Sequence, residues 1–233
     1  MRYDLKISLS FYKIIYSVVF MVIIIFIRGI STSGEVIAAL EPNAALLAGV
    51  FMADNYYKEF ANGNIQVFYR YSLKKKTIAM VRRSLIDIIY LLLLVLGAYW
   101  GYLIIYHPLG FSYDNNVSIM FHTLTACAIS IFFFGMLSFT ITNFTQKIGV
   151  GIGVSVIIWV CLSSSFAEYL PTFLKLFFLE ENNQQLGIYT PYYTSRFCYL
   201  FIALSLAVSN ICSLRKAPKY NKKGMVFKHG NRN

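Results

Sequence analysis

Six long, nearly uncharged apolar blocks constrain the fold of this chain more than any other feature. Each is close to the roughly 20 residues that an α-helix needs to cross the hydrocarbon core of a bilayer. A segment that crosses a bilayer must satisfy its own backbone hydrogen bonds, and barrel strands would be half as long with strict alternation. We therefore predict an all-α integral membrane protein with six transmembrane helices. The expected spans are about 12–30, 38–56, 85–106, 117–143, 148–170 and 196–214.

The composition supports a membrane domain over an unusually apolar soluble core. Of the 233 residues, 58% are hydrophobic and 13% are charged, whereas a soluble domain is about a quarter charged. The first apolar run, residues 14–27, is long, and no clear small-residue cleavage site follows it. We therefore expect a retained first span rather than a removed signal peptide.

The placement of the lysines and arginines predicts the orientation. With six spans, one side receives both termini and the loops after the second and fourth spans, and it carries 18 of the 21 basic residues. Because cytoplasmic loops are rich in Lys and Arg, both termini are expected in the cytoplasm. The net charge of +11 then reflects contact with anionic lipid and not with nucleic acid. Residues 1–214 form the expected transmembrane domain, and 215–233 a basic cytoplasmic tail.

Two segments outside the six expected spans are more than simple connections or ends. Polar residues recur at helical spacing in the first dozen residues, which indicates an N-terminal helix at the cytoplasmic interface or, alternatively, a frayed start of the first span. On the outer side, the segment 171–195 begins with a run too short to span and too apolar for a free loop. We expect it to form a short re-entrant helix between the fifth and sixth spans.

The cytoplasmic segment 57–84 is longer than a connection between two helices requires. Aromatic residues alternate there with cations, and Gly63 precedes a run that can form a short helix across the membrane face. This helix would present Phe68, Tyr69, Tyr71 and Leu73 to a partner. A membrane-surface helix anchored by lysines and tyrosines is the alternative, and the residues alone favour neither.

No convergent catalytic, metal-binding or nucleotide-binding set emerges from the sequence. The glycines Gly149, Gly151 and Gly153 lack the Gly-Lys-Ser/Thr that completes a phosphate-binding loop, so close helix packing is the better interpretation, as for Gly97 and Gly101. We therefore expect no enzyme activity, no metal and no cofactor in this chain. Three single carboxylates near span ends are expected to snorkel or to find a backbone partner: Glu41, Asp87 and Glu168. Three polar residues within or close to apolar blocks are expected to form interhelical hydrogen bonds: His122, Asn143 and Asn210.

The arrangement resembles the ABC-2 type permease family, the membrane subunits of many bacterial ABC exporters. The interfacial helix, the six spans, the segment after the second span and the outer re-entry all have counterparts in that family. The most specific match is Glu59-Phe-Ala-Asn-Gly63 followed by the hydrophobic and basic run to Arg83. It resembles the family's Glu-x-x-x-Gly step into a cytoplasmic coupling helix.

The resemblance implies a permease subunit in a bacterial cell membrane, driven by a separate ABC ATPase subunit that holds ATP and Mg²⁺. A second permease copy or a similar permease would complete the pathway between spans one, two and five. The implied ATPase-coupling residues are Glu59, Gly63, Phe68, Tyr69, Arg70, Tyr71, Leu73 and Lys74. The implied outer gate is Phe177, Phe178 and Leu179.

The cargo follows only by analogy. Aromatic spans with few internal charges suit an amphipathic molecule such as a peptide, toxin or antibiotic. Export of lipid or a lipid-linked glycan is a second possibility. A membrane-embedded enzyme or an assembly factor without a transport role is the rival from another class, and a holin-like pore fits the long cytoplasmic segment poorly.

Overall fold

The computed structural model describes residues 8–31, 33–55, 72–106, 113–177 and 190–213, together with residue 5. This part of the chain is all-helical, as expected, and holds six α-helices and no strand. Four of them (α3, α6, α7 and α9) are long and apolar enough to cross a membrane, while α2 and α8 are shorter apolar helices. The bounds are α2 (Phe11–Ile27), α3 (Ser33–Ala53), α6 (Leu73–Tyr106), α7 (Tyr113–Thr145), α8 (Ile148–Ser163) and α9 (Thr190–Ser213).

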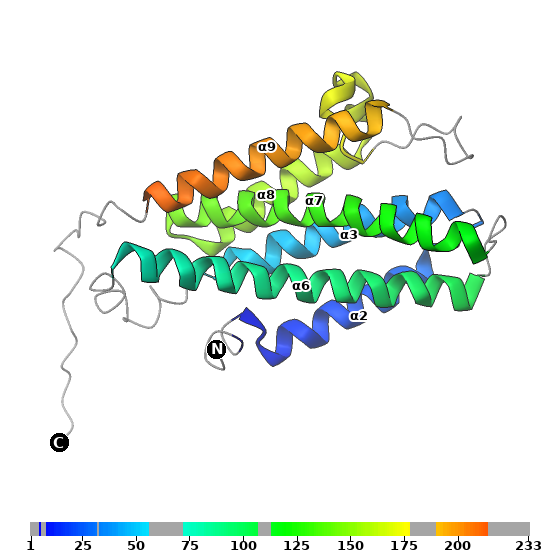
Figure 1. Ribbon diagram of the computed structural model, residues 1–233, viewed down its shortest axis with the longest axis horizontal. Coiled ribbons are helices and arrows are strands. Elements are labelled where there is room, and N and C mark those ends of the chain that lie inside the picture. Colours follow the sequence, from blue (N-terminus) through cyan, green and yellow to red (C-terminus); the bar gives the residue numbers. More distant parts are fainter. Residues whose placement is uncertain are drawn as a thin grey trace.

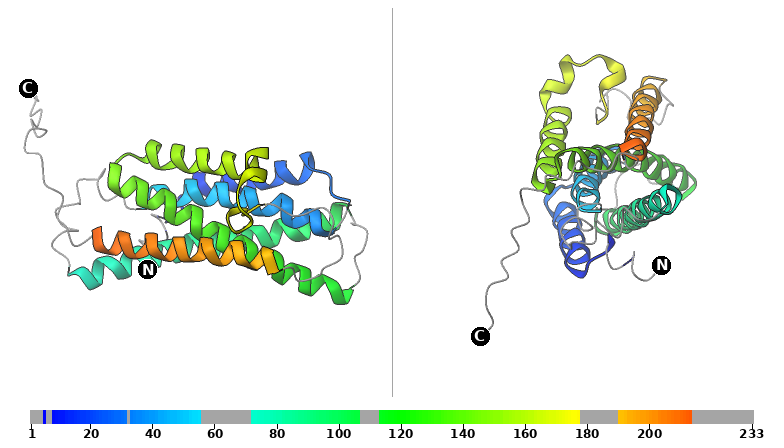
Figure 2. Two further views of the ribbon diagram at one scale, coloured as in Figure 1. Left: turned by 90° about the horizontal axis from the view of Figure 1, so that it is seen from above. Right: turned by 90° about the vertical axis from the view of Figure 1, so that its left-hand side faces the viewer.

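The six helices form one elongated bundle in which successive helices run in opposite directions (Figure 1). Seen end-on, α3 lies near the middle, with the other five around it (Figure 2). Its burial agrees with this position, since Leu40, Ala44, Ala48 and Phe51 are completely buried. The many alanines of α3 allow neighbouring helix backbones to approach closely, which suits a central helix in a membrane bundle.

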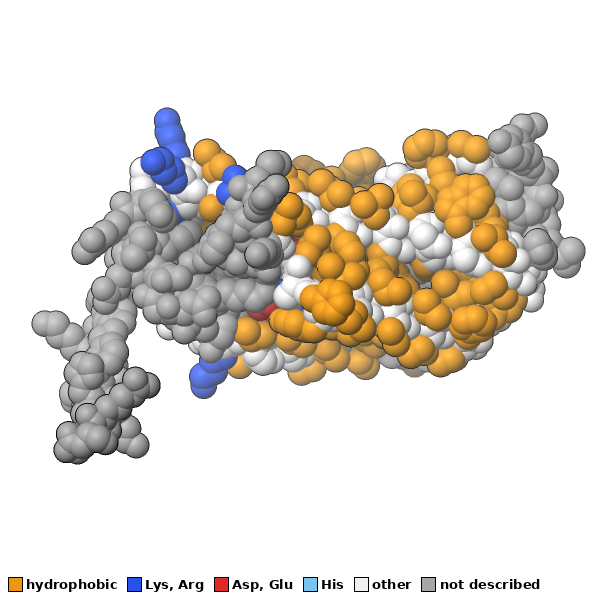
Figure 3. Space-filling model, turned by 90° about the horizontal axis from the view of Figure 1, so that it is seen from below, with side chains coloured by type: hydrophobic (Ala, Val, Ile, Leu, Met, Phe, Trp, Pro, Cys, Tyr) orange, Lys and Arg blue, Asp and Glu red, His pale blue; other side chains and the backbone are white. Residues whose placement is uncertain are grey.

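The surface of the bundle is apolar where a soluble protein would be polar. On α2 the buried positions include Lys13 and Ser17, whereas Val18, Ile23 and Phe26 are exposed. Hydrophobic side chains are spread over the described part of the face shown in Figure 3. Exposed apolar patches of this extent mark contact with another apolar phase, and a bilayer around the bundle supplies it.

The two ends of the bundle differ in charge. The end that holds the starts of α2, α6 and α8, here called the basic end, carries seven described Lys and Arg residues, and blue side chains mark it in Figure 3. The other end, here called the opposite end, carries three: Arg28, Lys175 and Arg196. The described residues therefore keep the asymmetry on which the predicted orientation rests.

Helix boundaries differ most from the expected spans at two places. Helix α6 begins at Leu73, so the last part of the expected cytoplasmic segment is continuous with the third span. Helix α8 ends at Ser163 and is followed by two 3₁₀ helices, η1 (Ser165–Tyr169) and η2 (Thr172–Leu174). Three consecutive serines explain this end, because their hydroxyls compete for backbone groups. The Ser164 hydroxyl accepts a hydrogen bond from Phe166 N at 3.3 Å.

A proline in α3 is accommodated by side chains from other helices. Pro42 has no N–H and so leaves the carbonyl of Ala38 without its helical donor. Nη1 of Arg28 donates to that carbonyl at 3.0 Å, and Nε1 of Trp159 donates to the carbonyl of Pro42 at 2.8 Å. Arg28 thus replaces the one helical donor that the proline removes, and Trp159 adds a hydrogen bond from α8 at the proline itself.

The glycines differ in their contacts. A Cβ on Gly151 of α8 would clash with the hydroxyl of Thr142 and lie 2.8 Å from the backbone oxygen of Ser138, both on α7. A Cβ on Gly101 would lie 3.0 Å from Ile25 Cδ1. Close packing is therefore confirmed at these two glycines. Around Gly97, Gly149 and Gly153 the described structure has nothing within 4 Å of an added Cβ.

Substitution of Gly151 by alanine is expected to lower the unfolding midpoint in detergent by roughly 5 °C, because α7 and α8 must separate to admit the methyl group. The matched substitution Gly153→Ala on the same helix should leave the midpoint unchanged or raise it slightly, since alanine favours the helix. Thermal unfolding of the two purified variants checks this. Equal losses for both would contradict the close α7–α8 contact.

Candidate functional site

A cluster of buried polar side chains joins α2, α3 and α6 at the basic end. Nζ of Lys13 lies 2.5 Å from Oδ1 of Asp54 and donates to the carbonyl of Phe51 at 2.8 Å. The Lys13 side chain is only 3% exposed and lies 5.1 Å from the centre of the Phe51 ring. A lysine this deeply buried requires an anionic partner, and Asp54 provides one at the end of α3.

The same cluster continues onto α6. Nδ2 of Asn55 donates to Oδ2 of Asp87 at 2.5 Å, and Nη1 of Arg83 donates to the carbonyl of Asn55 at 3.3 Å. One turn further along α6, Tyr90 shares a 2.7 Å hydrogen bond with Ser17 of α2. Asp87 and Arg83 are almost completely buried. We call Lys13, Asp54, Asn55, Arg83 and Asp87 the basic-end cluster.

The basic-end cluster flanks the segment that the sequence singles out for coupling. Asp54 and Asn55 come directly before residues 56–71. Helix α6 begins at Leu73, shortly after this segment. Of the expected coupling residues, Leu73 and Lys74 lie in the first turn of α6, with Lys74 exposed. The other six, Glu59, Gly63, Phe68, Tyr69, Arg70 and Tyr71, lie outside the described residues.

A second buried charge pair lies toward the opposite end. Oε2 of Glu41 lies 2.6 Å from Nη2 of Arg196, and Oε1 of Glu41 accepts a hydrogen bond from Ser130 at 2.7 Å. The Glu41 side chain is 1% exposed and that of Arg196 3%. This pair, the Glu41–Arg196 bridge, links α3 to α9, while Ser130 adds α7. Sequence analysis expected Glu41 to find a backbone partner or to snorkel, and instead its partners are side chains of two other helices.

Asparagines join α7 and α9 nearer the basic end. Nδ2 of Asn143 donates to Oδ1 of Asn210 at 3.2 Å, and Nδ2 of Asn210 donates to the Thr140 hydroxyl at 2.7 Å. The expected interhelical hydrogen bonds of both asparagines are confirmed. Their polar atoms are used within the bundle, which favours a structural role for them.

Of the three residues of the expected outer gate, the structure describes only Phe177. The ring of Phe177 stacks on that of Phe134 with centroids 5.9 Å apart, so the segment after η2 packs back onto α7. The hydroxyl of Tyr199 donates to the carbonyl of Leu174 at 2.7 Å, which holds η2 against α9. Phe178 and Leu179 lie outside the described residues.

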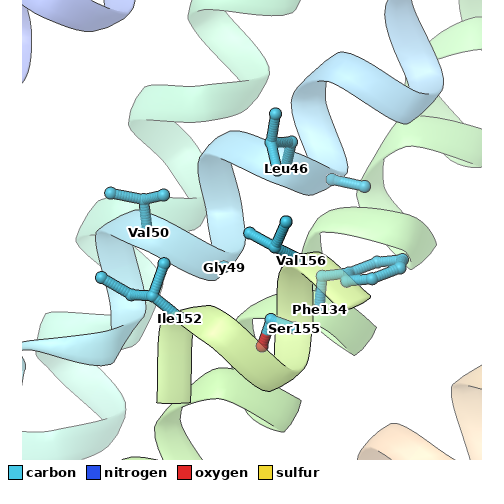
Figure 4. Close-up of a pocket in the computed structure, with 8 residues that line it drawn as sticks. Leu46, Gly49, Val50, Phe134, Ile152, Ser155 and Val156 are labelled. Carbon is cyan, nitrogen blue, oxygen red and sulfur yellow. The ribbon is translucent and has the colours of Figure 1, made fainter. Parts of the chain in front are cut away.

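Helices α3 and α8 pack closely where Gly49 faces Ser155 (Figure 4). A Cβ on Gly49 would lie 3.4 Å from the Cβ of Ser155, and the space left between these helices is too small for a water molecule. Figure 4 shows valine, leucine and isoleucine side chains on either side of the glycine. This gap is a packing feature and holds no ligand.

The described residues bring no three His, Cys, Asp or Glu side chains together as metal ligands require. The polar groups that do converge are two oppositely charged pairs and a set of hydrogen-bonded neutral side chains, all held between helices, an arrangement that fixes helix positions. Comparisons of the chain with protein-family models, with curated proteins and with solved structures gave no match.

Sequence analysis missed both charge pairs as pairs. A signal for the Glu41–Arg196 bridge was present, since the predicted topology places both residues on the outer side and next to apolar blocks. A charge within a bilayer needs a partner, and Arg196 is one of only three cations on that side. The partner of Lys13 was harder to predict from the sequence, because the second span was expected to continue past Asp54 to residue 56.

Proposed function

We propose that this chain is the membrane-spanning permease subunit of an ABC exporter, with six spans, both termini in the cytoplasm and a separate ATPase as its source of energy. The basic end is then the cytoplasmic end. Alternating helices, apolar outer faces and basic residues gathered at one end support this topology.

The basic-end cluster is the observation that carries the proposal. A permease driven by a separate ATPase needs a cytoplasmic element whose movement reaches the spans. Asp54 and Asn55 on one side of residues 56–71, and Arg83 and Asp87 on the other, are held together and tied to α2 through Lys13. A push on that segment would act on α2, α3 and α6 at once.

The 34-residue length of α6 supports the same proposal. At 1.5 Å per residue the helix is about 51 Å long, against a hydrocarbon core of about 30 Å. Its first turns, which hold Lys74, Lys75 and Lys76, can therefore extend beyond the membrane as a lever connected to the proposed coupling segment. In the assembled exporter two permeases and two ATPase subunits would form one pathway, and its cargo would be an amphipathic peptide, toxin or antibiotic.

The test replaces two aromatic residues in the proposed coupling segment. With Phe68→Ala and Tyr69→Ala together, the affinity for the ATPase should fall about thirtyfold or more, because an aromatic hot spot contributes 2 kcal/mol or more. Purification of the tagged chain from its native membrane in mild detergent, with quantitative mass spectrometry of its partners, measures the loss.

The chain offers a matched control for this test. Phe11 and Tyr12 form the same dipeptide, also toward the basic end, and are 77% and 60% exposed. Phe11→Ala with Tyr12→Ala should retain the ATPase. If the unchanged chain brings down no ATPase at all, the permease proposal fails. If the Phe68 and Tyr69 variant keeps both ATPase and transport, the coupling assignment is wrong.

A further inference from the structure

A cavity of about 200 Å³ opens between α6, α7 and α9 near the basic end. Its walls are almost entirely apolar, and two methionines contribute to them, which lets the walls adapt to an occupant. The residues that form most of the lining are Met80, Ile88, Phe132, Met136, Phe139 and Ala207. Val81 and Leu85, about half exposed, lie at its rim, so the cavity opens on the outer face of the bundle.

The polarity of the cavity changes along α6. From the middle of the helix toward its start, the α6 residues of the lining are Ile88, Leu85, Ser84, Val81, Met80 and Thr77, so the end nearest the start of the helix is a hydroxyl. Lys74 lies one turn before Thr77 on the same helical face and is exposed. The lining is thus mainly apolar as far as the Thr77 hydroxyl, and an exposed cation follows toward the basic end, in the same order as the acyl chain, glycerol and phosphate of a phospholipid.

The one amide among the lining residues already has its hydrogen-bond partners within the protein. Asn210 donates to Thr140 Oγ1 and to the carbonyl of Leu206, and it accepts from Asn143. Apolar cavities of this kind do not hold water, and one of roughly 150 Å³ binds a benzene-sized molecule. Drug-sized ligands need pockets of about 300 Å³ or more. The space therefore suits a section of an acyl chain and is too small for a whole amphipathic cargo.

We propose that this cavity binds an anionic phospholipid of the cytoplasmic leaflet, with one acyl chain between α6, α7 and α9 and its phosphate at Lys74. The occupant enters from the surrounding bilayer past Val81 and Leu85. Lipid at this place would fix α6 against α7 and α9. The proposal does not depend on the export function, because it rests on the cavity and on Lys74; only the cytoplasmic leaflet follows from the orientation proposed above.

The test measures the unfolding midpoint of the purified chain in dodecyl maltoside micelles titrated with dioleoyl-phosphatidylglycerol or dioleoyl-phosphatidylcholine. Phosphatidylglycerol should raise the midpoint at a lower lipid fraction than phosphatidylcholine does. Lys74→Gln should raise the phosphatidylglycerol fraction needed for half of this effect roughly fivefold, since a lysine near an anionic surface contributes about that factor. The matched variant Lys75→Gln removes an equally exposed charge from a different helical face and should change little.

Filling the cavity gives a second, independent readout. Ala207→Leu should abolish most of the response to phosphatidylglycerol, while Val208→Leu on the exposed face of α9 (Val208 is 60% exposed) should keep it. Ala207→Val serves as the smaller filling if leucine prevents folding. Equal responses to the two lipids, equal effects of Lys74→Gln and Lys75→Gln, or a full response in both Ala207 variants would each overturn the proposal.

Discussion

Replacement of Arg196 by methionine is expected to lower the unfolding midpoint of the purified protein by roughly 10 °C. The substitution leaves the Glu41 carboxylate buried between α3, α7 and α9, with the Ser130 hydroxyl as its remaining hydrogen-bond donor. Removing one member of a buried ion pair costs about 3–5 kcal/mol, and each kcal/mol corresponds to about 2–4 °C in a chain of this size. Thermal unfolding in detergent, followed by circular dichroism, measures the shift.

A double substitution separates loss of the pair from loss of the arginine side chain. Glu41→Gln keeps an oxygen that can accept from Ser130 and removes the negative charge, so Glu41→Gln with Arg196→Met should recover most of the stability. Lys75→Met, on an exposed lysine, controls for the loss of a cation as such. If the loss of stability in the double variant equals the sum of the losses in Glu41→Gln and Arg196→Met measured singly, the two charges do not act as a pair.

Replacement of Lys13 by methionine is expected to cost about 3 kcal/mol, or roughly 6–12 °C in midpoint. The cation faces Asp54 in a site where both side chains are largely buried, and it also donates to the carbonyl of Phe51. The change takes away the bond that joins α2 to the end of α3. Unfolding of the Lys13→Met variant checks the size of the effect, with Lys75→Met, on an exposed lysine of α6, as its control.

Exchange of the two charges tests whether the geometry or the charge at each position matters. Lys13→Asp with Asp54→Lys should recover part of the stability that Lys13→Met loses, because the attraction persists with its direction reversed. In membrane vesicles that contain the proposed ATPase subunit, the Lys13→Met variant should also uncouple ATP turnover from the proposed transport. Coupled transport at the normal ratio in Lys13→Met would show that the basic-end cluster does not transmit movement.

The helices and the charged end of the bundle follow from the sequence alone. Six apolar blocks predicted six helices, and each described α-helix begins within about 12 residues of its expected span. This succeeds because both signals are local: length and hydropathy of a segment decide whether it can form a helix in lipid, and cations next to a segment decide its direction.

The tertiary structure alone decided which residues meet. Glu41 and Arg196 are 155 positions apart and Lys13 and Asp54 are 41 apart, and nothing local to either residue identifies its partner. The same limit applies to glycines, since Gly151 touches α7 while Gly153, two residues later, faces away from it.

The physical reason is the solvent. In water, the apolar stripe of a helix marks its buried face, but in a bilayer both the lipid-facing and the protein-facing sides are apolar. On α2, exposed Val18 and buried Met21 are equally compatible with either side. The rotation of each helix about its axis, and with it the choice of partners for Lys13, Glu41 and Arg196, is therefore set by packing against the neighbouring helices.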